Sequence, residues 1–294
     1  MQRGIWYGLF TYAAWGLLPI YWKALSTVPA LEILANRVIW SLLLALLILL
    51  VRRNWSWLRE ARRPDVFVIY IAAAGLLAIN WFVYIWAVND GHVVETSLGY
   101  FINPLVNVVL GVLIFHETLR PFQWGAVGIA ALGVLYLTVT YGALPWIALT
   151  LAFSFGFYGV LKKRARLASL EGLVLETGVL SIAGLLYLGW LAAHGTAALT
   201  TAPPATVALL FGTGVVTLFP LLGFAAAARR VPLSVLGFLQ YLAPTLQFSL
   251  GVLLYHEAFP PSRLVGFVLI WLALAIFSTD GVLTRRKRLR EGYA

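Results

Sequence analysis

The sequence has no cysteine and a single methionine among its 294 residues, so it forms no disulfide bonds and uses no thiolate chemistry. Charged side chains are also scarce, because only 11% of the residues are Asp, Glu, Lys or Arg. A soluble domain of this length needs more charge to cover its surface. The composition therefore excludes an ordinary soluble protein.

Catalytic motifs are missing as well. A zinc protease motif, H-E-x-x-H, would place a second histidine four positions after the first, but Arg120 follows His116 there and Pro260 follows His256. The sequence contains neither the phosphate-binding G-x-x-x-x-G-K-[ST] loop nor the G-x-S-x-G nucleophile elbow. We therefore predict no catalytic residue, no metal site and no cofactor, which argues against a membrane-embedded enzyme.

Apolar residues are abundant instead, at 62% of the chain, with a mean hydropathy of +0.90. They fall into ten segments, each close to the roughly 20 residues that an α-helix needs to cross a bilayer. We predict an all-α integral membrane protein with ten transmembrane helices, surrounded by membrane lipids. The expected spans are residues 4–23, 33–51, 67–89, 94–115, 122–140, 143–161, 172–193, 207–228, 232–256 and 262–280.

The basic residues predict the orientation. A pI near 10 suggests nucleic acid, but the charges sit in short runs between apolar segments, which is typical of membrane proteins. With the N-terminus inside, all but three of the 21 lysines and arginines, namely Lys23, Arg37 and Arg263, lie on the cytoplasmic side. We therefore predict a multi-pass protein of a cell membrane with both termini cytoplasmic and no nucleic-acid partner.

One stretch of the chain occurs twice. Residues 97–117 read SLGYFINPLVNVVLGVLIFHE and residues 237–257 read GFLQYLAPTLQFSLGVLLYHE, so that Pro104 aligns with Pro244 at an offset of 140. Five spans in each half is an odd number, so the halves must insert in opposite directions. We predict two inverted five-helix repeats, followed by a basic cytoplasmic tail. These units are residues 4–140, 143–280 and 281–294.

A proline-interrupted span in corresponding positions of two halves indicates a transport site, and we expect Pro104 and Pro244 to break their helices. Small and polar residues share one face of each span, including Asn107 in the first and Gln247 in the second. Such a stripe either lines a cavity or packs helices together. We favour the cavity, because amide side chains at mid-depth are costly away from water or ligand.

The predicted substrate-binding residues are polar or aromatic side chains at mid-span. For those outside the two stripes, a purely structural role is an equal alternative. The full set is Trp15, Asn80, Tyr84, Tyr100, Asn103, Asn107, Ser154, Tyr158, Gln240 and Gln247.

Two charges inside spans occupy equivalent positions of the repeats, Arg37 and Glu176. Inversion puts them at opposite membrane faces, so they cannot pair. Each is expected either to form an ion pair that fixes helix ends or to act as a gate charge, as is Glu95. The expected partners are Glu32 and Glu95 for Arg37, and Lys163 or Arg229 for Glu176.

The two His-Glu pairs, at 116–117 and 256–257, are expected to be solvated loop residues. Energy coupling depends on Glu176, because the chain has no ATP-binding motif. Burial favours the neutral form of a carboxyl group, whereas a nearby cation favours the carboxylate. We expect the cation to prevail, which favours facilitation or exchange without an obligatory proton.

Six runs of the sequence resemble the RarD proteins, which belong to the EamA group of the drug/metabolite transporter superfamily. The similarity extends from about residue 4 to residue 283. The runs are WGLLPIYWK (15–23), EILANRVIWS (32–41), NWFVYIWAVN (80–89), ETSLGYFINPLVNVVLG (95–111), AFSFGFYG (152–159) and GFLQYLAPTL (237–246).

This resemblance implies ten helices in two inverted EamA repeats and a place in the bacterial inner membrane. Relatives export amino acids and other metabolites, and the RarD name is associated with chloramphenicol sensitivity. The resemblance implies a secondary transporter that exports a small organic metabolite, amino acid or drug by alternating access. The alternative is a lipid flippase or scramblase, which would need a polar groove open to lipid.

Overall fold

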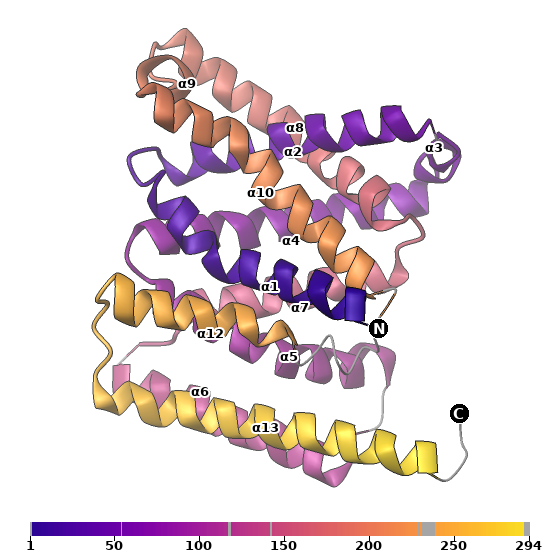
Figure 1. The fold of residues 1–294 in the computed structure, drawn as a ribbon, viewed down its shortest axis with the longest axis vertical. Coiled ribbons are helices and arrows are strands. Elements are labelled where there is room, and N and C mark those ends of the chain that lie inside the picture. The colour runs from indigo at the N-terminus through magenta and orange to yellow at the C-terminus, as the bar shows by residue number, and fades with distance from the viewer. Residues whose placement is uncertain are drawn as a thin grey trace.

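The computed structural model describes residues 2–53, 55–116, 119–141, 143–228, 230 and 239–290. Its helices lie side by side in one elongated bundle (Figure 1). The helices of the first half are α1 (Gln2–Lys23), α2 (Ala30–Arg52), α3 (Trp57–Ala61), α4 (Pro64–Asn89), α5 (Val93–Phe115) and α6 (Pro121–Tyr141).

The second half repeats this order. The ninth span of the chain, which is the fourth of this half, ends in a π-helical turn, η1. The elements are α7 (Trp146–Arg164), α8 (Ser169–Ala193), α9 (Ala198–Thr201), α10 (Pro204–Ala228), α12 (Leu242–Ser249), η1 (Leu250–Leu254) and α13 (Pro261–Arg290).

Among the described residues, six helices, α2, α4, α5, α6, α8 and α10, are long and apolar enough to cross a membrane. Shorter apolar helices form in α7, in α12 with η1, and in α13, and α1 adds a further 22 residues. The short helices α3 and α9 lie in the two long links of the chain. The prediction of an all-helical membrane protein with ten spans is confirmed.

The most extensive helix contacts in the described part of the chain join the two halves. Helix α6 packs on α13, α2 packs on α8 and α10, and α5 packs on α7 and α12 (Figure 1). These contacts come in equivalent pairs, because α5 packs on α7 as α12 packs on α1, and α4 on α8 as α10 on α2. The halves therefore share one interface that follows the symmetry of the repeat.

Helices α5 and α12 are antiparallel, as inverted repeats require. Gly251, in η1 just after α12, lies against Val94 at the start of α5, so close that a Cβ on Gly251 would be 2.7 Å from Val94 Cγ2. His116 caps the end of α5, and His256 lies two residues after η1; both, at an offset of 140, have the left-handed conformation, with φ of 53° and 52°. The same backbone device thus closes both copies of the duplicated stretch.

The two prolines behave differently. Pro104 lies inside α5, which is continuous from Val93 to Phe115, so the predicted break at this position is wrong. Pro244 lies in the first turn of α12, where a helix needs no N–H donor, and Tyr241 interrupts the helical ladder just before it. Residues 231–238 of the predicted ninth span lie outside the described residues.

The basic tail predicted at residues 281–294 is helical through Arg290, because α13 continues to that residue.

Candidate functional site

The end of the bundle that contains Lys23 is called here the Lys23 end, and the opposite end the Lys162 end. At the Lys23 end, the Glu257 carboxylate accepts hydrogen bonds from the backbone N–H groups of Val93 (2.7 Å) and Val94 (2.8 Å). These N–H groups lie in the first turn of α5 and lack hydrogen-bond partners within the helix. The predicted solvated loop is therefore wrong for Glu257, although His256 is exposed. Glu117 lies outside the described residues.

Two other glutamates at this end also meet backbone N–H groups. Glu32, only 1% exposed, accepts a hydrogen bond from the N–H of Ala198 at 2.6 Å. Glu95 interacts with the backbone of Ile147 and Ala148 at the start of α7. A carboxylate near a helix N-terminus is stabilising, because the free N–H groups carry partial positive charge.

Arg37, in α2, is buried against residues of α1, α4 and α10 and is 5% exposed. Its guanidinium carbon is 3.9 Å from the centre of the Trp81 ring and 5.0 Å from that of Trp22. Its Nε donates a hydrogen bond to Thr217 Oγ1 at 3.0 Å. The predicted partners Glu32 and Glu95 are wrong, because both carboxylates are engaged at helix N-termini.

Glu176 is fully buried at the Lys162 end and has two partners on α7. Lys162 Nζ lies 2.8 Å from its Oε1, and the Tyr158 hydroxyl donates a hydrogen bond to its Oε2 at 3.1 Å. Residues 158 and 162 are one helical turn apart, so both side chains point at the same place. The predicted partner was Lys163 or Arg229, and the partner observed is Lys162.

Several predicted substrate-binding residues join helices of opposite halves. Asn80 donates to the carbonyl of Leu151 (3.1 Å) and to Ser154 Oγ (3.0 Å), which links α4 to α7. Asn103 donates to the carbonyl of Ala152 at 3.1 Å, which links α5 to α7. These side chains are at most 6% exposed, so the packing alternative fits them.

Gln247 has the equivalent role in the second half. Its Nε2 donates to the carbonyl of Trp15 at 3.1 Å, which links α12 to α1, while its buried Oε1 has no partner. The ring of Trp15 is partly buried and packs edge-on against Tyr12, with 5.6 Å between ring centres. Gln240 is partly exposed just before α12.

The stripe on α5 leads inward from an exposed residue. Asn107 is exposed, and its Nδ2 donates to Asn103 Oδ1 at 3.0 Å. About two turns away, the partly buried Tyr100 packs edge-on against Tyr84, with ring centres 5.6 Å apart. Tyr84 and Tyr100 both lie near Arg37. The stripe therefore connects the surface near Asn107 with the surroundings of Arg37.

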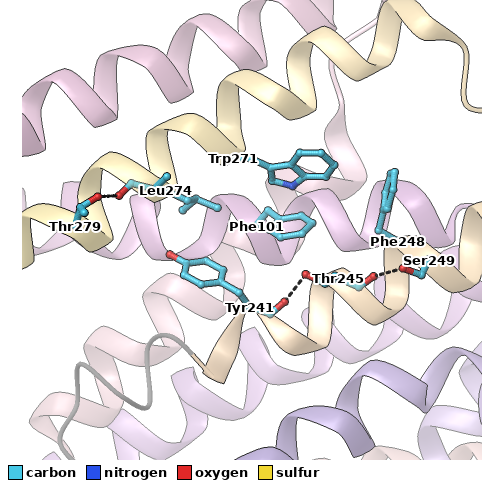
Figure 2. Close-up of a pocket in the computed structure, with 9 residues that line it drawn as sticks. Phe101, Tyr241, Thr245, Phe248, Ser249, Trp271, Leu274 and Thr279 are labelled. Carbon is cyan, nitrogen blue, oxygen red and sulfur yellow. Dashed lines mark hydrogen bonds between the residues drawn. The ribbon is translucent and has the colours of Figure 1, made fainter. Parts of the chain in front are cut away.

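An open groove of about 720 Å³ lies between α12 and α13 (Figure 2). The hydroxyl groups of its serine and threonines are used within their own helices, because Thr245 donates to the carbonyl of Tyr241, Ser249 to that of Thr245 and Thr279 to that of Ala275. The wall is therefore apolar and suits an acyl chain better than a polar solute. None of the predicted substrate-binding residues lines it. The lining residues are Phe101, Tyr241, Thr245, Phe248, Ser249, Trp271, Leu274, Ala275 and Thr279.

The model of one protein family matches the chain twice, at residues 2–139 and again at residues 144–279, and its description is the EamA-like transporter family. The chain belongs to the EamA-like transporter family. It is therefore a multi-pass membrane protein and a transporter, not an enzyme. The two matches correspond to the two helical halves described above.

Curated relatives of this EamA protein match over nearly their whole length. It is 49% identical to Protein RarD of Streptomyces exfoliatus, over 98% of this chain and 92% of the relative. It is 45% identical to an uncharacterized transporter of Pseudomonas aeruginosa, over 99% and 98%. It is 43% identical to Protein RarD of Escherichia coli, over 97% of each chain. The EamA protein is thus of the RarD type.

A solved structure, titled only as the crystal structure of a protein, has the same fold. It superposes with a TM-score of 0.57 over 94% of this chain and 97% of the other, at 19% identity.

Sequence reasoning missed the surroundings of both buried charges in this EamA protein. Trp22, Trp81 and Thr217 contact Arg37, and none was singled out from the sequence. The sequence did contain one indication of these contacts, because Trp22 and Lys162 occupy equivalent positions of the two repeats, at the same offset of 140 as the prolines. Each of these two residues contacts the buried charge of its own half.

Proposed function

We propose that the protein is a secondary transporter that exports a small organic solute across the bacterial inner membrane by alternating access. The Lys23 end faces the outside, and both termini are cytoplasmic. The distribution of basic residues supports this orientation, because Arg59, Arg62 and Arg63 in and after α3, together with Arg164 at the end of α7 and Arg166 after it, belong to the Lys162 end.

One observation carries the proposal. The two helices with the duplicated prolines, α5 and α12, contact each other antiparallel at the interface between the halves. At the Lys23 end this interface is closed, because Glu257 of the second half binds the start of α5 in the first. Lys23 adds a hydrogen bond to the carbonyl of Asn89 (3.2 Å) and lies 5.5 Å from the ring centre of Tyr255. Toward the other end, Asn107 of α5 is exposed.

Such an arrangement fits a conformation closed to the outside. Rocking of one repeat against the other would break the Glu257 contact and open the Lys23 end. Within this proposal the solute passes Asn107, Tyr100 and Tyr84, with Trp15 of α1 in the same half and Gln240 on the opposing half. The remaining candidates hold the helices around the path. They are Asn80, Asn103, Ser154, Tyr158 and Gln247.

The pairing of Glu176 supports facilitation or exchange without an obligatory proton. A carboxylate with a lysine at 2.8 Å and a phenol hydroxyl at 3.1 Å is stabilised in its charged form. A proton carrier needs to lose and regain its proton during the cycle, and these two partners oppose that exchange.

A lipid flippase has less support. It would need polar groups along a groove open to lipid, whereas the groove between α12 and α13 presents mainly apolar side chains, and its serine and threonine hydroxyls are already bonded within their helices.

The test is solute counterflow in proteoliposomes with two matched substitutions. Asn107→Leu should reduce flux about tenfold or more with only a small loss of melting temperature, because its one protein hydrogen bond, to Asn103, lies within α5 and joins no second helix. Asn80→Leu should instead lower stability by about 1–3 kcal/mol, because Ser154 loses a buried partner. Wild-type protein that moves no solute from a broad panel of amino acids, organic acids and drugs, while folded in the vesicles, would contradict the proposed function.

A further inference from the structure

Arg37 is a buried cation without a counter-ion in the described part of the chain. Its guanidinium makes one hydrogen bond, to the neutral hydroxyl of Thr217, and its Nη1 has no partner. The two tryptophan rings attract the charge but supply no hydrogen-bond acceptor. A buried charge that is neither paired nor fully hydrogen-bonded is strongly unfavourable, so its presence calls for a function.

The acidic residues of this end are committed elsewhere. Glu32, Glu95 and Glu257 each meet the backbone N–H groups of a helix start. Glu176 lies at the other end with Lys162. Among the residues that the structure describes, the carboxylates of this end thus serve helix N-termini, and none is a partner of Arg37.

Other unsatisfied donors lie next to Arg37. The hydroxyl of Tyr84 and the indole N–H of Trp22 are buried without hydrogen-bond partners, and the Trp22 ring packs against the guanidinium. Arginine and indole N–H groups can only donate, and a carboxylate can only accept. These groups therefore match the carboxylate of a ligand, because a neutral acceptor could take the hydrogen bonds but would leave the Arg37 charge unpaired, and a cation would be repelled.

The surroundings of Arg37 are connected to the proposed solute path. Tyr84 packs against Tyr100, and Tyr100 shares a face of α5 with the exposed Asn107, about 10 Å along the helix axis. The side chains around Arg37 include the rings of Trp22, Trp81, Tyr84 and Tyr100, which would suit the apolar or aromatic body of a small molecule.

We propose that Arg37 binds the carboxylate of the transported solute, which is therefore a small organic anion with an apolar or aromatic body. This assignment rests on the proposed transport function and adds its substrate class. The guanidinium forms the ion pair that the protein itself does not provide, with the Tyr84 hydroxyl as a second donor.

The test uses the purified full-length protein and pairs of probes that differ only in charge. Benzoate is paired with benzamide, phenylacetate with phenylacetamide, and indole-3-acetate with its amide. Melting temperatures are measured with each probe, and the hits are followed by binding and counterflow. We expect stabilisation by carboxylates and not by their amides, with at least a tenfold weaker Kd in Arg37→Gln and a smaller loss in Arg37→Lys.

Two measurements separate binding from a structural role. Without ligand, Arg37→Gln should melt at or above the wild-type temperature, because it removes an unpaired buried charge. The control is Arg263→Gln, which removes a partly exposed positive charge from the same end and should keep carboxylate binding. A lower melting temperature for Arg37→Gln with unchanged carboxylate binding would show that Arg37 only packs helices.

The outcomes also separate this inference from the proposed function. Flux of neutral or cationic solutes that persists in Arg37→Gln, together with no stabilisation by any carboxylate probe, would overturn the anion site and leave the transporter intact. Carboxylate binding that depends on Arg37 without any flux would support the site and contradict transport.

Discussion

Arg37 in the first half and Glu176 in the second occupy equivalent positions of the repeat and have opposite environments. Each carboxylate oxygen of Glu176 has a partner within the protein, Lys162 for one and Tyr158 for the other, so Glu176 needs no ligand. Arg37 has aromatic rings, one hydroxyl and an unsatisfied N–H. The difference begins at the aligned positions 22 and 162, where the first half has a tryptophan and the second a lysine.

The comparison shows how an inverted repeat can keep its geometry and divide its tasks. Both halves place a charge in their second span, and the neighbouring first span decides whether that charge is neutralised. In the second half the ion pair fixes α7 against α8. In the first half the cation stays available beside the path that we propose for the solute.

The largest expected effect comes from breaking the ion pair of the second half. Lys162→Met leaves the Glu176 carboxylate buried with only Tyr158, and we expect a loss of about 3 kcal/mol in the free energy of unfolding. Arg37→Met, the matched change in the first half, should cost no more than about 1 kcal/mol, because it removes a charge that has no counter-ion. Thermal unfolding of both variants in the same detergent makes the measurement.

The double variant Lys162→Met with Glu176→Gln serves as the control and should recover most of the loss, because no buried charge remains. Equal losses for Lys162→Met and Arg37→Met would mean that the two sites do not differ as described.

Alanine substitutions at two glycines of α8 should have smaller effects on stability. A Cβ on Gly172 would lie 2.7 Å from Lys162 Nζ and 2.9 Å from Tyr70 Cε1, so Gly172→Ala should push the lysine away from Glu176 at a cost of about 1 kcal/mol. Gly178→Ala on the same helix meets no atom within 4 Å and should instead stabilise by about 0.5–1 kcal/mol. Melting temperatures that fall in Gly172→Ala and rise in Gly178→Ala would confirm that the ion pair depends on the space at Gly172. Equal shifts in the two variants would contradict it.

The sequence was sufficient for the fold, because apolar segments of bilayer length and an offset of 140 residues do not depend on tertiary packing. It was insufficient for the partners of the buried charges. Thr217 is 180 residues from Arg37, and Val93 is 164 residues from Glu257, so only the docking of one half on the other brings each pair together. A cation between two aromatic rings also leaves no periodic signal in a sequence.

The stripes illustrate the same limit. Asn107 belongs to the first stripe and Asn103 lies beside it, one turn away on α5, yet Asn103 is 1% exposed and bonds to α7 while Asn107 is exposed. Which residue of a polar stripe faces a neighbouring helix depends on the crossing of α5 and α7, and helical spacing alone does not specify that crossing.

Alternating access at the Lys23 end is tested most directly by a distance across the Glu257 contact. Because the chain has no cysteine, spin labels at Asp90→Cys and Ala258→Cys would be the only two, and pulsed electron resonance would report their separation in proteoliposomes. The account predicts a short distance, a second and longer one when a transported solute is present, and a larger share of the longer one in Glu257→Ala, which removes the bonds to Val93 and Val94. A single short distance in all three samples, with solute flux still measurable, would contradict it.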